Sequence, residues 1–266
     1  MLFFDVCARI ESLTNTRYML TKGRAKSIQQ LQEKKYRNEK GLFVVEGEKS
    51  VVELLQSDFK LDALFITAYF KQKYLQLLNT SQVAWELVEQ KEIENMGTLE
   101  TNNAALAIAK QKPATSLSVG SGELVLALDT IRDPGNLGTI IRIADWYGIK
   151  KIIASATTTD FYNSKTISAT MGSFTRVQMM YTNLEEFLKE TSLPILGAFL
   201  NGTSVHTYKF PKEGILVMGN ESNGISSEIS AIIKEKITIP AFGKAESLNA
   251  SVATAVILDN WKRNLL

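Results

Sequence analysis

Short apolar runs alternate with segments of helical periodicity along nearly the whole chain, and this alternation limits the folds open to it. Runs such as "ELVLALDT" (123–130) and "GILVMGNE" (214–221) are largely apolar throughout rather than at every second position. Such runs are typical of parallel strands that are buried on both faces. We therefore predict an α/β fold in which helices cover both faces of a parallel sheet.

Two such series are separated by a non-periodic stretch rich in Ser, Thr, Gly and Pro, at 111–122. We expect a smaller amino-terminal α/β domain over 1–112, of which 1–23 form a leading segment, then a linker at 113–121. A larger domain should follow over 122–266. In the first domain the pattern predicts one helix over 24–40, ending near Gly41, and a strand over 83–88.

The composition excludes several classes of protein. A hydrophobic content of 45% and a charged content of 22% are those of a soluble globular protein. No apolar run reaches the roughly 18–20 residues of a membrane span, and the first ten residues do not resemble a signal peptide. One cysteine, Cys7, fits a reducing cytoplasm without disulfides. With a single histidine, His206, the chain has no His/Cys cluster for zinc, and we expect no metal.

Positive charge is concentrated near the amino terminus. Residues 17–40 carry eight Lys and Arg against two Glu, although the whole chain has a net charge of only +2. Such a segment is typical of a protein that contacts a polyanion. The alternative is an ordinary solvated helix face.

The segment "DTIRDPGNLGTIIRIADWYG" (129–148) has the strand–turn–helix form of many phosphate-binding loops, with a helix amino terminus expected at 137–140. It lacks the third glycine and the later acid of a dinucleotide-binding fingerprint, and the chain has no P-loop. A serine hydrolase is also disfavoured, because the spacing around Ser222 is not that of a nucleophile elbow.

Three separate segments follow one another in the chain. They are "DTIRDPGNLGTIIRIADWYG", with Asn136 and Arg142; "VMGNESNGIS" (217–226), with Gly219 and Glu221; and "IPAFGKAESLNASVATAVIL" (239–258), with Ser247, Leu248 and Asn249. Together, in this order, they resemble the SpoU (TrmH-type) branch of the SPOUT RNA 2′-O-ribose methyltransferases. The amino-terminal part is similar to that family's ribosomal L30e-like substrate-binding domain, notably over "KYRNEKGLFVVEGEKSVVELL" (35–55).

The resemblance implies a carboxyl-terminal domain tied in a deep trefoil knot, a pocket for S-adenosylmethionine, and a homodimer in which both subunits contribute to each site. An adenine is commonly held by backbone groups between apolar walls. Ile239 and Leu248 could equally be plain core residues. The cofactor-binding residues that the resemblance implies are Leu216, Val217, Met218, Gly219, Ile239, Gly243, Leu248 and Asn249.

By the same resemblance, Arg142 would engage the target ribose hydroxyl, and a guanidinium, which stays protonated, favours stabilising an alkoxide over acting as a free base. The alternative is a surface arginine paired with Asp145 or with a Glu. Asn136 would orient Arg142 or the hydroxyl, unless it is a turn residue. Glu221 would orient Arg142 or the substrate, unless it caps a helix. Ser247 and Asn249 complete the catalytic set, with a simple N-cap as the alternative for Ser247.

Basic side chains should bind the RNA backbone, and Tyr36 or Phe43 could stack on a base. We expect Trp261 to pack in the core or at the dimer interface. The predicted activity is methyl transfer to a ribose 2′-hydroxyl, with ribosomal RNA favoured as substrate; transfer RNA and a non-catalytic RNA-binding role are the alternatives. The candidate RNA-binding residues are Lys34, Lys35, Arg37, Lys40, Lys165 and Arg176.

Overall fold

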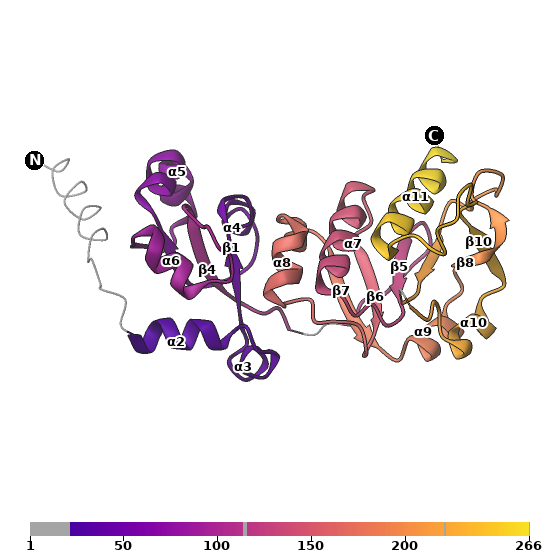
Figure 1. Cartoon of the computed structure of the whole chain (residues 1–266), viewed down its shortest axis with the longest axis horizontal. Helices are drawn as coiled ribbons and strands as arrows, with labels where there is room; N and C mark the ends of the chain where they lie inside the picture. The colour runs from indigo at the N-terminus through magenta and orange to yellow at the C-terminus, as the bar shows by residue number, and fades with distance from the viewer. Residues whose placement is uncertain (1–21, 114–115, 221, 266) are drawn as a thin grey trace, which may run out of the picture. The chain divides into compact units, whose positions relative to one another are not determined.

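The computed structural model describes residues 22–113, 116–220 and 222–265 (Figure 1). The chain divides into two compact units, one reaching to Lys112 and including Tyr162–Ser164, the other made of Pro113–Phe161 and Lys165–Leu266. Within the described residues, no helix is both long and apolar enough to cross a membrane. Cys7 and the predicted leading segment up to residue 21 lie outside the described part.

The amino-terminal unit is a mixed sheet with helices around it. Its strands run in the order β1-β4-β2-β3, with β4 antiparallel to both β1 and β2 and with β3 parallel to β2. The strand expected over 83–88 is reduced to two paired residues. The strands are β1 (Leu42–Glu46), β2 (Leu61–Ile66), β3 (Glu86–Leu87) and β4 (Ala105–Lys110), and the helices are α2 (Lys22–Gln30), α3 (Lys34–Lys40), α4 (Glu48–Leu55), α5 (Ala68–Ser81) and α6 (Gln90–Met96).

The single helix predicted over 24–40 is in fact two helices, α2 and α3. The guanidinium of Arg37, a residue of α3, donates hydrogen bonds to two carbonyl oxygens of the segment between the helices, those of Leu31 (2.9 Å) and Gln32 (2.6 Å). These carbonyls lie just past the end of α2, where helical backbone acceptors lose their partners. The predicted end at Gly41 is confirmed, because Gly41 caps α3 in the left-handed conformation (φ 63°) that glycine tolerates best.

The second unit contains the predicted parallel sheet. Its order is β10-β8-β9-β5-β6-β7, and all neighbouring strands pair in parallel. The strands are β5 (Leu124–Leu128), β6 (Lys151–Ser155), β7 (Gln178–Thr182), β8 (Ile195–Ser204), β9 (Gly214–Met218) and β10 (Glu235–Thr238), and the helices are α7 (Pro134–Trp146), α8 (Ser164–Thr170), α9 (Leu184–Glu190), α10 (Ser227–Ile232) and α11 (Ala250–Arg263).

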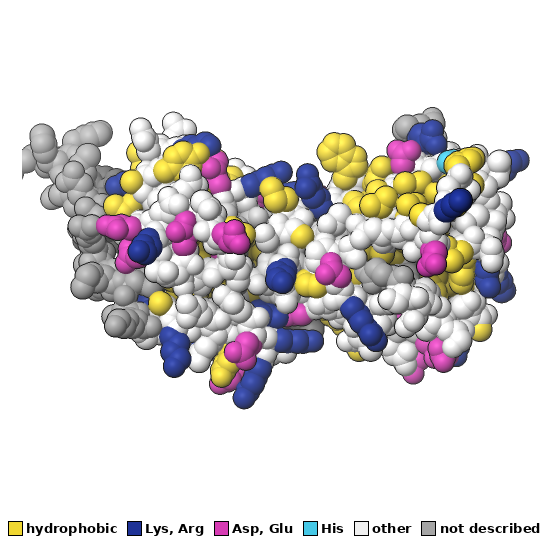
Figure 2. All heavy atoms as spheres, in the orientation of Figure 1, with side chains coloured by type: hydrophobic (Ala, Val, Ile, Leu, Met, Phe, Trp, Pro, Cys, Tyr) yellow, Lys and Arg dark blue, Asp and Glu magenta, His cyan; other side chains and the backbone are white. Residues whose placement is uncertain are grey.

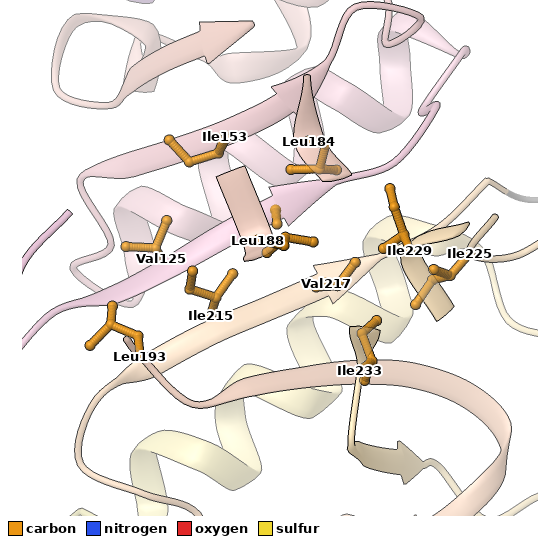
Figure 3. Close-up of a cluster of buried hydrophobic side chains, with 11 residues drawn as sticks. Val125, Ile153, Leu184, Leu188, Leu193, Ile215, Val217, Ile225, Ile229 and Ile233 are labelled. Carbon is orange, nitrogen blue, oxygen red and sulfur yellow. The ribbon is translucent and has the colours of Figure 1, made fainter. Parts of the chain in front are cut away.

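Helices cover both faces of this sheet, as predicted. In Figure 1, α7, α8 and α11 lie on one side of the strands and α9 and α10 on the other. Alternate residues of a strand point to opposite faces. Val125 and Val217 therefore join the core under α9 and α10, with Leu188 and Ile229 among its buried members (Figure 3).

The helix α7 fits closely against α8 because residue 138 is a glycine. A Cβ atom at Gly138 would lie 2.4 Å from the carbonyl oxygen of Thr166 and 2.6 Å from the Cβ of Ala169. Both distances are too short for non-bonded atoms. Glycine at this position therefore allows α7 to lie against α8.

Candidate functional site

Two of the three segments singled out in the sequence lie at the carboxyl ends of the central strands β5 and β9, and the third follows β10 at the edge of the sheet. In the sheet, β6 and β7 lie on one side of β5. On its other side lie β9, then β8 and then β10. In open α/β sheets, ligands bind at this point of reversal, beyond the carboxyl ends of the strands. The loop 129–133 after β5 and the loop 219–226 after β9 both begin there.

The helix α7 begins at Pro134, three residues earlier than predicted. Asp133 is its N-cap and accepts a 2.7 Å hydrogen bond from the backbone N–H of Asn136. Proline at the first helical position needs no backbone donor and already has a helical φ, so Asp-Pro starts the helix. Asn136 therefore lies in the first helical turn, and its alternative role as a left-handed turn residue is wrong.

Asn249 brings the third segment to the first. Its side-chain amide donates a 2.8 Å hydrogen bond to Oδ1 of Asn136, while its own Oδ1 accepts from the backbone N–H of Ser251 at 2.9 Å. Asn249 is thus the N-cap of α11, the helix that packs beside α7. The alternative role of Ser247 as an N-cap is wrong; Ser247 is exposed, two residues before the cap.

The loop over 239–248 offers free backbone groups next to this junction. Within the described residues, none of its N–H or C=O groups forms a backbone–backbone hydrogen bond, and side chains 241–248 are exposed. A Cβ at Gly243 would meet nothing within 4 Å. Leu248 is half exposed, so it is not a core residue, and Ile239 is partly buried. Such a loop suits a ligand that is recognised by main-chain groups, and its assignment to an adenine stays a prediction.

The loop after β9 is folded tightly onto itself. Asn220 and Gly224 form an antiparallel bridge, and a Cβ at Gly219 would lie 2.2 Å from the backbone carbon of Gly224. Gly219 is therefore required by the loop itself. Leu216, Val217 and Met218, by contrast, are buried in the sheet, and only their backbone could face a ligand. Glu221 lies outside the described residues, and its role stays a prediction.

Arg142 is exposed on α7, and no hydrogen bond or ion pair joins it to any residue of the described chain. Its alternative partner, Asp145, is occupied by Arg176, whose Nη2 lies 2.8 Å from Oδ2 of Asp145. The interpretation of Arg142 as half of a local ion pair with Asp145 is therefore wrong. An arginine without a described partner is available to a phosphate or to a developing oxyanion.

The predicted RNA-binding residues differ in their environments. Lys34, Lys35 and Lys40 are exposed on α3. Arg37 is only 1% exposed, so its assignment to the RNA backbone is corrected: it stabilises the junction of α2 and α3 instead. Phe43 is likewise fully buried and cannot stack on a base.

Two of the predicted RNA-binding residues, Lys165 and Arg176, lie outside α3. Lys165 is exposed near the start of α8. Arg176 follows the turn at Gly172 and forms the ion pair with Asp145, so a phosphate would have to share its guanidinium. Trp261 packs in the core: it stacks on Phe210, and its Nε1 donates a 2.7 Å hydrogen bond to the carbonyl of Pro211.

The comparison with known families decides what this arrangement is. The model described as "SpoU rRNA Methylase family" matches residues 123–259, about half of the chain. The chain belongs to this family. The model described as "MRM3-like substrate binding domain" matches residues 22–107. The resemblance stated from the three sequence segments is thereby confirmed.

Individual relatives agree with the family. The "23S rRNA (guanosine(2553)-2'-O)-methyltransferase RlmP" of Bacillus subtilis is 28% identical over 244 residues, which cover 88% of this chain and 94% of the relative. A TrmH-family structure from Porphyromonas gingivalis is 34% identical, with a TM-score of 0.78, covering 92% of this chain and 99% of that one. An AdoMet-bound rRNA methyltransferase from Sinorhizobium meliloti is 31% identical, with a TM-score of 0.82 and coverages of 93% and 97%.

Proposed function

We propose that this SpoU-family protein transfers a methyl group from S-adenosylmethionine to a ribose 2′-hydroxyl of ribosomal RNA. The observation that carries the proposal is the hydrogen bond between Asn136 and Asn249, which joins two of the three family segments at the reversal point of the sheet. The S. meliloti structure, 31% identical, is described as AdoMet-bound, which supports the choice of methyl donor. The RlmP relative is named for 2′-O-methylation of 23S rRNA, which supports the choice of substrate.

The methyl donor would be held by the loop 239–248 and by the backbone at Gly219. Their open amides and carbonyls can recognise an adenine without charged side chains. When bound, S-adenosylmethionine would supply an electrophilic methyl group: the ribose oxygen would bond to the methyl carbon as the carbon–sulfur bond breaks in line, S-adenosylhomocysteine would leave, and the hydroxyl proton would pass to water. The protein's contribution is therefore to place that oxygen and to stabilise its developing charge.

Arg142 is the residue to which we assign this charge stabilisation. Its guanidinium is protonated at neutral pH, so it suits an oxyanion and the neighbouring RNA phosphate better than it suits proton abstraction. Asn136 and Asn249 form the polar junction beside which the ribose would lie, and Ser247, in the same exposed loop, would contact substrate or cofactor. Glu221 keeps its predicted orienting role.

A homodimer completes the proposal, because α7 and α11 present an apolar surface. Trp146 at the end of α7 is 83% exposed, and Val252 on α11 is about half exposed. Figure 2 shows hydrophobic side chains gathered over these two helices. A large exposed apolar patch marks an interaction surface. A second copy is the natural occupant, since the patch lies on the helices that carry Arg142 and Asn249, and pairing them would bring two sites together.

The dimer is tested by Trp146→Glu, measured by sedimentation at micromolar concentration. We expect the wild type to sediment as a dimer and Trp146→Glu as a monomer without methyltransferase activity. Leu200→Glu is the matched control, because Leu200 is also strongly exposed but lies on β8. A monomeric wild type, or an unchanged dimer in the variant, would contradict the proposal.

The finer features of the fold are also proposals. We infer that residues 122–266 form a deep trefoil knot and that residues 1–112 are an L30e-like RNA-binding domain, joined by the linker at 113–121. The insertion of β9 between β5 and β8 and the packing of the last helix, α11, against α7 support the first inference. The match to a substrate-binding family model supports an RNA-binding role for the amino-terminal domain. We place the reaction in the cytoplasm.

The decisive experiment maps ribose methylation in cells that lack the gene. Loss of 2′-O-methylation at one ribosomal RNA nucleotide, restored by the purified protein with S-adenosylmethionine, is the expected result. If 2′-O-methylation were lost only in transfer RNA, transfer RNA would be the substrate instead. Calorimetry with S-adenosylmethionine distinguishes a methyltransferase, which would bind the cofactor, from a non-catalytic RNA-binding protein, which would not.

A further inference from the structure

Thr130, the residue after the buried Asp129 at the end of β5, has an unusual backbone conformation. Its φ is +61°, in the left-handed region that β-branched residues rarely occupy. Such conformations persist only where surrounding contacts hold them, and they cluster at functional sites. The sequence gives no sign of this, because a threonine after a strand is unremarkable.

Hydrogen bonds from two directions hold Thr130 in place. On one side, its N–H donates to Oγ of Ser155 (2.9 Å), and its Oγ1 lies 2.8 Å from Oγ1 of Thr157. On the other side, its carbonyl oxygen accepts a 2.9 Å hydrogen bond from the side-chain amide of Asn220. Thr130 thus lies between the loop after β6 and the loop after β9.

The loop after β9 makes few hydrogen bonds to the rest of the chain, although its Ile225 is buried in the core under α9 and α10. Among described residues, every hydrogen bond from 219–226 to the rest of the chain outside α10 goes to Asp129 or Thr130. Asp129, which is buried, accepts a 2.7 Å bond from the N–H of Ser226. Through these hydrogen bonds, displacement of the loop acts directly on Asp129 and Thr130.

Thr130 is also close in sequence to the substrate side of the site. Three residues separate it from Pro134, where α7 begins, and Asn136 lies in the first turn of that helix. Because the backbone between them is short, a change in the conformation of Thr130 changes the position of Asp133 and Asn136. The clasp formed by Thr130 and Asn220 thus links the loop of Gly219 to the start of α7.

We propose that Thr130 and Asn220 are positioning residues that couple the two halves of the site, so that cofactor and RNA bind cooperatively. The inference rests on the proposed function, since it assigns the loop of Gly219 to the cofactor and Asn136 to the ribose. A ligand at one site shifts affinity at the other only if the two share a responsive element. The hydrogen bond between Thr130 and Asn220 is the element that we propose the two sites share. Asn220 moves with the loop after β9, and the backbone that follows Thr130 continues into α7.

The test is a binding cycle with S-adenosylhomocysteine, which cannot react, and end-labelled 23S ribosomal RNA transcript. RNA affinity is measured by filter binding with and without saturating S-adenosylhomocysteine. For the wild type we expect at least a fivefold tightening, within the usual range of such coupling. For Asn220→Ala we expect less than a twofold change, with the affinity for each ligand alone within twofold of wild type.

Two further variants distinguish coupling from simple loss of structure. Asn223→Ala is the matched control, because Asn223 lies in the same loop with its side chain exposed, and it should keep the full coupling. Thr130→Gly accepts a positive φ and keeps the carbonyl oxygen that Asn220 contacts, so its melting temperature should stay close to that of the wild type. It loses the hydroxyl contact with Thr157, which helps to hold residue 130 from the side of β6, and should therefore lose the coupling. A structural role alone would lower the melting temperature and leave the ratio of affinities unchanged.

Two results would overturn the inference. The RNA affinity of the wild type could be the same with and without S-adenosylhomocysteine, or the RNA affinity of Asn220→Ala could rise with S-adenosylhomocysteine as much as that of the wild type. Failure of the proposed function looks different. In that case the wild type binds neither S-adenosylmethionine nor S-adenosylhomocysteine and methylates no RNA. A wild type that methylates ribosomal RNA without any coupling would reject the clasp alone.

Discussion

Asn249 donates a 2.8 Å hydrogen bond to Asn136 across 113 positions of sequence. Each asparagine lies at the start of a helix, and the two helices pack side by side. The bond therefore fixes the first turn of α7 against the first turn of α11. The two polar groups are held at the edge of the sheet where the proposed ribose and cofactor meet.

The two roles of Asn249, capping and contact with Asn136, can be separated by substitution. Serine also caps helices but is too short to reach Asn136. We expect Asn249→Ser to keep its melting temperature within about 1 °C and to lose most methyl transfer. Asn249→Ala should in addition lose about 1 kcal/mol of stability, or roughly 2–4 °C. Thermal unfolding and a tritiated-methyl assay measure the two effects; full activity in Asn249→Ser would contradict the proposed role.

Arg142→Lys tests the charge-stabilising role. Arg142 is exposed and has no described partner, so the change should alter stability by less than about 0.5 kcal/mol. Lysine keeps the charge but loses the planar fork that binds a phosphate and an oxyanion together. We expect methylation to fall below detection while S-adenosylmethionine affinity, measured by calorimetry, stays normal. Arg263→Lys on α11 is the control, and retained activity in Arg142→Lys would refute the assignment.

Lys34 and Lys35 should contribute to RNA affinity without contributing to stability. Both are exposed on α3. Removing two phosphate contacts should lower the slope of log affinity against log salt concentration by about 1.5. The double variant Lys34→Ala/Lys35→Ala is compared with Lys60→Ala/Lys91→Ala, which removes equal charge elsewhere on the same unit. Equal salt slopes in the two variants would show that α3 does not bind RNA.

Arg37 should behave in the opposite way. Its buried guanidinium satisfies the carbonyls of Leu31 and Gln32, and removal leaves buried acceptors without partners. We expect Arg37→Ala to destabilise the amino-terminal unit by about 2–3 kcal/mol, seen as faster amide exchange in α2 and a lower urea midpoint. Unchanged exchange in α2 would contradict this structural role.

The ion pair of Asp145 and Arg176 predicts a pH-dependent contribution to stability. Burial raises the pKa of Asp145, but hydrogen bonds from Arg176 and Ser173 outweigh it and leave the pKa below its ordinary value. The folded pKa is then lower than the unfolded pKa of about 3.9, so the stabilisation is present above that pH and is lost as pH falls through the folded pKa.

Asp145→Asn should therefore be less stable than the wild type at pH 7 and equal to it at strongly acid pH. Because Arg176 is 45% exposed, the difference at pH 7 should be no more than about 1 kcal/mol. Urea unfolding of both proteins from pH 7 down to strongly acid pH, below the folded pKa of Asp145, measures it. A difference that stays constant over this range would mean that the loss has another cause.

The sequence was sufficient for the architecture of the second unit because its strands are apolar runs separated by amphipathic helices. Periodicity alone places β5, α7 and β9, and the family resemblance identifies Asn136 and Asn249. Neither the periodicity nor the resemblance reveals that the side chains of Asn136 and Asn249 are hydrogen-bonded, because a contact across 113 positions depends on the order of strands in the sheet.

Other errors arose where a polar side chain decides the backbone. The spacing of Ile28, Leu31 and Tyr36 predicts one helix over 24–40, whereas the buried guanidinium of Arg37 binds the carbonyls at the break between α2 and α3. The pattern predicts the start of α7 at 137–140, whereas the capping side chain of Asp133 starts the helix at Pro134. Thr130 carried no signal at all, since its conformation is imposed by partners on two distant loops.

The position of β9 between β5 and β8 also has a consequence for how the protein is made. The central pair of the sheet aligns Leu124–Leu128 with Gly214–Met218, so its hydrogen bonds cannot form on the ribosome until both segments have emerged. Pairings between distant segments close large loops and fold slowly. Newly made chains should therefore pass through a long-lived state with exposed β5 and β6, and the yield of soluble protein should rise when synthesis is slowed at low temperature.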